Sequence, residues 1–75
     1  MDLKERKELL KTLKEKLKNI TFPKEPVSLN DAERVVDCDK FVKAHLLFIE
    51  SYIGLDICLP YFQRLINFIN KIQTP

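Results

Sequence analysis

The feature that most constrains the fold is a stretch, residues 37–53, that is apolar over more than half of a helical circumference. At about 100° per residue, an apolar group that includes Phe41, His45 and Ile49 covers roughly 200° of the helix. So wide an arc must be covered on two sides, and we expect the rest of the chain to supply both covers. Gly54, the only glycine, predicts a left-handed residue that ends this helix.

Two further helices are predicted, one on each side of this stretch. Residues 2–19 consist largely of Leu, Lys and Glu, which are strong helix formers, and Asp2 suits the N-cap. Residues 60–73 begin with a proline, which favours the first helical position, and carry an apolar arc of roughly 160°. The first helix has a narrower apolar arc of roughly 120°, formed by Leu3, Leu9, Leu10, Leu13, Leu17 and Ile20.

The connection between the second and third helices, residues 38–53 and 60–73, is short. Such helices are usually antiparallel neighbours. Folding the chain back near residue 56 brings Arg64 level with the end of the second helix. Glu50 or a nearby carbonyl is therefore the expected partner of Arg64.

Residues 20–37 are predicted to form an extended connector between the first two helices. Pro23 and Pro26 stop a helix and favour extended backbone at the residues before them. Apolar residues such as Phe22 should pin the connector across the helices. A capping-box pattern within the connector allows one short helical turn at residues 31–35.

Composition agrees with a helical fold and excludes several classes. One glycine and four prolines are too few for the many turns of a β-rich fold, and 45% hydrophobic residues place the chain well above disorder. The 75 residues are enough for one small domain. We therefore expect an all-α, compact three-helix domain, residues 1–75, with an extended proline-containing connector between helices 1 and 2.

Five lysines on the first helix are the most distinctive charge pattern. They recur at intervals of three and four, and occupy an arc of only about 80°: Lys4, Lys7, Lys11, Lys14 and Lys18. Such a stripe can contact an anionic surface, either nucleic acid or an acidic partner. It can equally be a solvated face that keeps a small domain soluble. Nucleic acid is weakly supported, because no aromatic residues interleave with the lysines and the net charge is only +2.

Residues with catalytic or metal-binding potential are few. His45 lies on the apolar arc, where we expect a packed imidazole hydrogen-bonded to connector backbone or a tyrosine. Cys38 and Cys58 are separated by about 20 Å if a helix lies between them, which exceeds the roughly 7 Å limit for a disulfide. We expect two free, packed thiols, although exposure at the helix start would make Cys38 reactive. Asp37 and Asp39 read as helix-start residues.

No catalytic residue, metal ligand, cofactor or small-molecule substrate is therefore predicted, and we expect a protein that is not an enzyme. Leu47 lies in the polar face of the second helix, and Phe68 lies at the edge of the apolar arc of the third. If both are exposed, they form part of a protein-contact or dimer patch. The predicted function is a small protein-interaction module, whose partner is another protein or a second copy. The alternative is binding of an anionic surface through the lysine stripe.

Location is predicted from what the sequence does not contain. The N-terminal residues are charged and have no apolar core typical of a signal peptide. The longest apolar run, residues 46–49, is far too short for a membrane span. A cytoplasmic location is the expectation.

Short motifs within residues 20–66 resemble a family of small, uncharacterised bacterial helical domains. The resemblance implies a compact helical fold and a bacterial origin, and it implies no activity, substrate, cofactor or site residue. The motifs that carry it are Phe22-Pro23-Lys24-Glu25-Pro26-Val27, Leu29, Val36-Asp37, Phe41-Val42, His45-Leu46, Pro60-Tyr61 and Arg64-Leu65.

Overall fold

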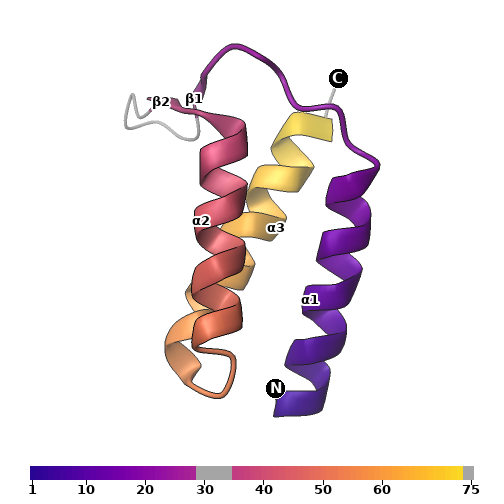
Figure 1. Cartoon of the computed structure of the whole chain (residues 1–75), viewed down its shortest axis with the longest axis vertical. Helices are drawn as coiled ribbons and strands as arrows, with labels where there is room; N and C mark the ends of the chain where they lie inside the picture. The colour runs from indigo at the N-terminus through magenta and orange to yellow at the C-terminus, as the bar shows by residue number, and fades with distance from the viewer. Residues whose placement is uncertain (29–34, 74–75) are drawn as a thin grey trace.

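Three helices form most of the protein, and α2 runs antiparallel to both of the others (Figure 1). The computed structural model describes residues 1–28 and 35–73. The expected all-α, three-helix class with an extended connector is confirmed. In chain order the elements are α1 (Leu3–Lys18), β1 (Val27–Ser28), β2 (Val35–Val36), α2 (Cys38–Ser51), the short 3₁₀ helix η1 (Asp56–Cys58) and α3 (Leu59–Gln73).

Aspartate side chains begin the first two long helices. Asp2 accepts a hydrogen bond from the Glu5 amide at 2.8 Å, and Asp37 accepts one from the Lys40 amide at 3.0 Å. Each carboxylate satisfies an amide that has no partner within the helix and carries a charge that favours the positive helix end. Asp39 instead pairs with Lys43 one turn later, at 2.9 Å. Asp37 and Asp39 are therefore both helix-start residues, as predicted.

The end of α2 differs from the prediction. The helix ends at Ser51 rather than near residue 53, and Tyr52 is its C-cap. Gly54 does not adopt the expected left-handed conformation, because its φ lies outside the range from +20° to +160°. The Leu55 amide donates to the Tyr52 carbonyl at 2.9 Å, which closes a turn without a positive φ. α2 therefore ends in a turn that does not depend on a left-handed glycine.

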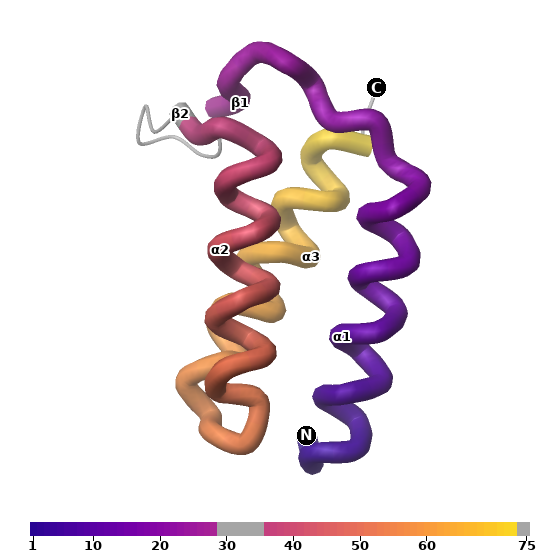
Figure 2. The backbone as a smooth tube through the Cα atoms, viewed as in Figure 1, coloured from indigo at the N-terminus to yellow at the C-terminus, as the bar shows by residue number. Residues whose placement is uncertain are grey.

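The connector crosses the end of the bundle at which α3 finishes, as Figure 2 traces. It contains a feature the sequence did not predict. β1 and β2 form a two-residue antiparallel pair in which Val27 lies opposite Val36. Most of the possible helical turn at residues 31–35 lies outside the described residues, and its last residue, Val35, belongs to β2 instead.

The core lies where α3 contacts both α2 and α1. Leu65 and Ile49 are fully enclosed between α3 and α2. The apolar arc of α2 is thus covered mainly by α3, and α1 covers less of it than the two-sided cover we expected. The buried apolar residues are Leu10, Leu13, Leu17, Cys38, Val42, Ile49, Cys58, Phe62, Leu65, Phe68 and Ile69.

A continuous column of rings joins the connector to both α2 and α3. Phe68 lies near its beginning, stacked on Phe41 with centroids 4.7 Å apart and edge-on to Phe22 at 6.3 Å. Such geometries add to the stability that burial alone provides. In order of contact, the rings are Phe22, Phe68, Phe41, His45, Tyr61, Phe48 and Tyr52.

Candidate interaction surfaces

Arg6 joins the first turn of α1 to the turn between α2 and α3. Its Nη2 donates to the Asp56 carboxylate at 2.6 Å, and its Nη1 donates to the Ile53 carbonyl at 3.0 Å. Its Nε donates to the Met1 carbonyl at 3.1 Å. One guanidinium therefore ties Met1 and the start of α1 to the turn between α2 and α3, and its side chain is only 9% exposed.

The hydrogen bond that Arg6 donates to the Asp56 carboxylate raises the pKa of the guanidinium above its ordinary value, and burial opposes this. The residue stays charged throughout the accessible pH range. Our prediction assigned Arg6 no role, although a signal was present. On a helical wheel it lies in the middle of the leucine arc that includes Leu10, Leu13 and Leu17. A charged residue at the centre of an apolar arc indicates a buried partner.

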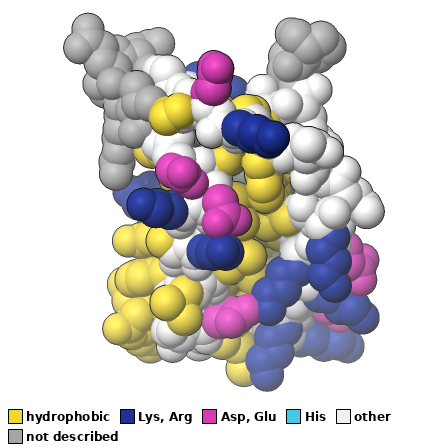
Figure 3. All heavy atoms as spheres, turned by 45° about the horizontal axis from the view of Figure 1, so that its top comes forward, with side chains coloured by type: hydrophobic (Ala, Val, Ile, Leu, Met, Phe, Trp, Pro, Cys, Tyr) yellow, Lys and Arg dark blue, Asp and Glu magenta, His cyan; other side chains and the backbone are white. Residues whose placement is uncertain are grey.

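Several exposed apolar side chains belong to the segments at the end of the molecule where Arg6 makes this contact. Met1 and Leu3 lie at the start of α1, while Tyr52, Leu55 and Ile57 lie around the turn that Arg6 binds. These five side chains, which we call the apolar end, are between 42% and 56% exposed. Figure 3 shows apolar side chains clustered over the turn between α2 and α3. Leu3 was expected in the buried stripe and is instead 46% exposed, because α1 begins beyond the edge of α3.

The predicted patch of Leu47 and Phe68 does not exist as a surface. Leu47 is exposed, at 66%, in agreement with its place on the polar face of α2. Phe68 is only 2% exposed and lies in the core. The prediction of partial exposure for Phe68 was wrong, since the connector places Phe22 against the edge of its ring. Leu47 is left as a single exposed leucine on the helix.

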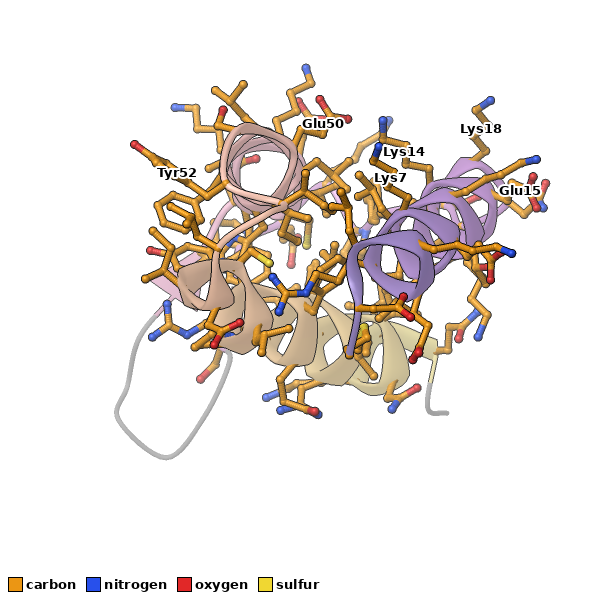
Figure 4. The ribbon with its side chains drawn as sticks, turned by 90° about the horizontal axis from the view of Figure 1, so that it is seen from below. Lys7, Lys14, Glu15, Lys18, Glu50 and Tyr52 are labelled. Carbon is orange, nitrogen blue, oxygen red and sulfur yellow. The ribbon has the colours of Figure 1, made fainter. Side chains whose placement is uncertain are left out.

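The lysine stripe divides into two parts. Lys4, Lys7, Lys11 and Lys18 are exposed, and none of them forms an ion pair with the residues the structure describes. Lys14 is half-buried and pairs with Glu50 of α2. Figure 4 shows Lys7, Lys14 and Glu50 on the same side of the bundle, with Lys18 pointing away.

The Lys14 pair also corrects the partner expected for Arg64. Glu50 is occupied by α1, and the Arg64 guanidinium lies over the Tyr61 ring, 5.1 Å from its centroid. This is a cation–π contact on the surface of α3. The prediction failed because it considered only α2 and α3, and α1 reaches Glu50 from the other side.

His45 is part of the ring column. Its Nδ1 donates to the Phe41 carbonyl of the preceding turn at 2.8 Å, and its ring stacks on the Phe41 ring with centroids 3.9 Å apart. The Tyr61 ring lies 5.3 Å away on the other helix. The half-buried, packed imidazole is as expected, and the bond from its Nδ1 to its own helix is a contact that was not predicted.

Both cysteines are free and buried, as expected. Burial, with the nearby Asp37 charge, raises the pKa of the Cys38 thiol above its ordinary value. A buried neutral thiol is a poor nucleophile, so Cys38 lacks the exposure that reactivity at the helix start requires. The Cys58 thiol donates to the Ile53 carbonyl at 3.7 Å and lies 4.0 Å from the Arg6 guanidinium.

Two other kinds of feature are absent from the described part of the chain. Within residues 1–28 and 35–73, no three His, Cys, Asp or Glu side chains lie close enough together to hold a metal ion. None of the helices in these residues has the length and apolar character needed to cross a membrane.

Comparison with known proteins agrees with the resemblance seen in the motifs of residues 20–66. A family model described as a domain of unknown function (DUF6965) matches residues 8–74. Neither the curated proteins nor the solved structures that were compared with the chain match it. The matched region contains the connector, α2, α3 and most of α1, while Arg6 lies just before it. The chain belongs to the DUF6965 family, a domain of unknown function.

Proposed function

We propose that this domain is a non-enzymatic protein-interaction module that self-associates through the apolar end. The observation that carries the proposal is that Met1, Leu3, Tyr52, Leu55 and Ile57, each about half exposed, all belong to segments at one end of the molecule. Single exposed apolar residues are common on monomeric proteins, but contiguous groups often mark contact sites.

The charges at this end of the molecule favour a second copy as the partner. Arg6 and Asp56, which lie on the same segments as the apolar end, neutralise each other. Two identical surfaces can therefore face each other there without strong like-charge repulsion, as a two-fold dimer requires. The group is small, so association should be weak, with a dissociation constant on the order of 0.1–1 mM.

A non-catalytic role is supported by how the reactive side chains are used. The His45 ring packs against Phe41 and Tyr61, and both thiols are buried. Free thiols also suit a reducing compartment, which supports the proposed cytoplasmic location. The bacterial origin implied by the family resemblance stays a prediction.

Sedimentation velocity over a range of concentrations tests self-association. The double variant Leu55→Ser with Ile57→Ser removes apolar contact area at two exposed positions and should leave the fold intact. We expect the wild-type sedimentation coefficient to rise with concentration and that of the double variant to stay at the monomer value.

Leu47→Ser is the matched control, because it changes the most exposed of the leucines that the structure describes without touching the apolar end. It should associate like the wild type. A wild-type protein that stays monomeric at millimolar concentration contradicts self-association. Loss of association in Leu47→Ser alone would place the interface on α2 instead.

A further inference from the structure

One face of α1 lines an open groove that the apolar end does not explain. The groove has a volume of about 580 Å³, and its lining residues all come from the first half of the helix. Their spacing places them on adjacent rows of one helical face. They are Leu3, Lys4, Lys7, Glu8 and Lys11.

Positive charge on this face has no ion-pair partner among residues 1–28 and 35–73. Lys4, Lys7 and Lys11 extend along about 10 Å of the helix, and Glu8 is the one acidic residue that lines the groove with them. Lys14 and Lys43, by contrast, each have an acidic partner. Lysines three and four residues apart repel one another, so a carboxylate brought to this face relieves a repulsion already present.

The other lining residues restrict what kind of anion fits. Leu3 is 46% exposed and offers an apolar contact at one end of the lysine row. Glu8 disfavours a continuous phosphate backbone but tolerates a protein segment that carries an occasional basic residue. No aromatic ring lines the groove, and the nearest arginine, Arg6, is bound to Asp56. Stacking platforms and free arginines, which nucleic-acid sites commonly use, are therefore missing from its lining.

We propose that this face of α1 binds an acidic amphipathic helix of a partner protein. Carboxylates at positions i, i+3 and i+7 of a parallel partner helix would face Lys4, Lys7 and Lys11, and an apolar side chain would cover Leu3. A helix is the matching shape, because the lysines lie in a row along a straight helix and a second helix repeats its side chains at the same spacing.

The test uses a synthetic peptide of Glu, Ala and Leu, with Glu at i, i+3 and i+7 and Leu on the adjoining face. The peptide is titrated into the ¹⁵N-labelled protein at low salt, and binding is followed by amide chemical shifts. We expect the largest shifts in residues 3–11 and affinity that falls as salt rises. Lys4→Glu, Lys7→Glu and Lys11→Glu together should weaken binding by about tenfold or more.

Lys24→Glu, Lys40→Glu and Lys71→Glu together form the matched control. They change the net charge by the same amount, at exposed lysines outside α1. This variant should bind within about twofold of the wild type if position matters more than net charge. An equal loss of peptide affinity in both triple variants overturns the proposal. Equal binding of a scrambled peptide of the same composition overturns it as well.

Two competitors distinguish other occupants. A short DNA duplex or phosphatidylserine vesicles that bind residues 3–11 more tightly than the peptide would assign the face to nucleic acid or to a bilayer and overturn the proposal. The inference does not rest on self-association, because the Leu55→Ser with Ile57→Ser variant should bind the peptide as the wild type does.

Discussion

The Arg6 guanidinium and the Asp56 carboxylate lie 2.6 Å apart across fifty residues of sequence, and they differ sharply in exposure. The arginine side chain is 9% exposed and the aspartate side chain is 87% exposed. The contact is thus an enclosed cation held by a solvated anion. Most of what Arg6 contributes should come from its packing and its two carbonyl acceptors rather than from the ion pair itself.

Substitutions at the two residues should therefore have unequal effects. Arg6→Ala should lower the melting temperature most, by several degrees, because it removes the donor to the Met1 carbonyl and leaves the Ile53 carbonyl with only the Cys58 thiol. Arg6→Lys should lower the melting temperature by an intermediate amount, since an ammonium cannot reproduce the planar fork of hydrogen-bond donors. Asp56→Asn should lower the melting temperature least. Thermal unfolding followed by circular dichroism gives the order, and equal loss in Asp56→Asn and Arg6→Ala would contradict it.

Phe68 and Leu47 provide a direct contrast between a core residue and a surface residue. Phe68→Ala should destabilise the domain by about 3–5 kcal/mol, because it empties the space between Phe22 and Phe41. Leu47→Ala should change stability by less than about 0.5 kcal/mol. Urea unfolding measures both, and Phe68→Leu provides a milder variant if the alanine variant does not fold. Similar effects at the two positions would be inconsistent with the burial of Phe68.

Gly54→Ala should stabilise the protein by about 0.4–1 kcal/mol. The φ of Gly54 is not in the left-handed range, and an added Cβ meets no atom within 4 Å. Alanine therefore fits the native turn while reducing the conformational entropy of the unfolded chain. The urea midpoint should rise at an unchanged slope. A fall in the midpoint would show that the turn needs glycine after all.

The Cys38 thiol should react slowly with thiol reagents until the protein unfolds, because it is 2% exposed and its pKa is raised. The raised pKa also predicts a pH effect with a definite sign. The stabilising contribution is complete below the ordinary thiol pKa and is lost as pH rises toward the higher folded value. The difference in unfolding free energy between the wild type and Cys38→Ala should therefore shrink in alkali. A constant difference would argue against the raised pKa.

Periodicity and end signals were sufficient for the fold class and the three helices. The wide apolar arc of residues 37–53 required two covering elements, and the capping roles of Asp2 and Asp37 follow from residue type and place. These features are local, so the sequence expresses them directly. The two-residue pairing of Val27 with Val36 was missed because so short a ladder has no periodicity to detect.

Contacts across the fold were harder to predict. Phe68 was misjudged because its cover comes from Phe22 in the connector, and Glu50 was misassigned because Lys14 reaches it from α1. Arg6 was the exception, since its place within a leucine arc carried information that was not used. The apolar end could not be foreseen, because it depends on where α1 starts relative to the turn between α2 and α3.

The ring column has a consequence for how the molecule comes apart. Seven rings touch in succession from the connector through α2 and α3, so displacing any one of them leaves its neighbours without packing. These segments should open as a single cooperative unit. α1 contributes no ring and is held by leucines, the Arg6 guanidinium and the Lys14–Glu50 ion pair. The amides of α1 should therefore exchange with solvent first, and α1 should detach from the bundle before the other two helices unfold.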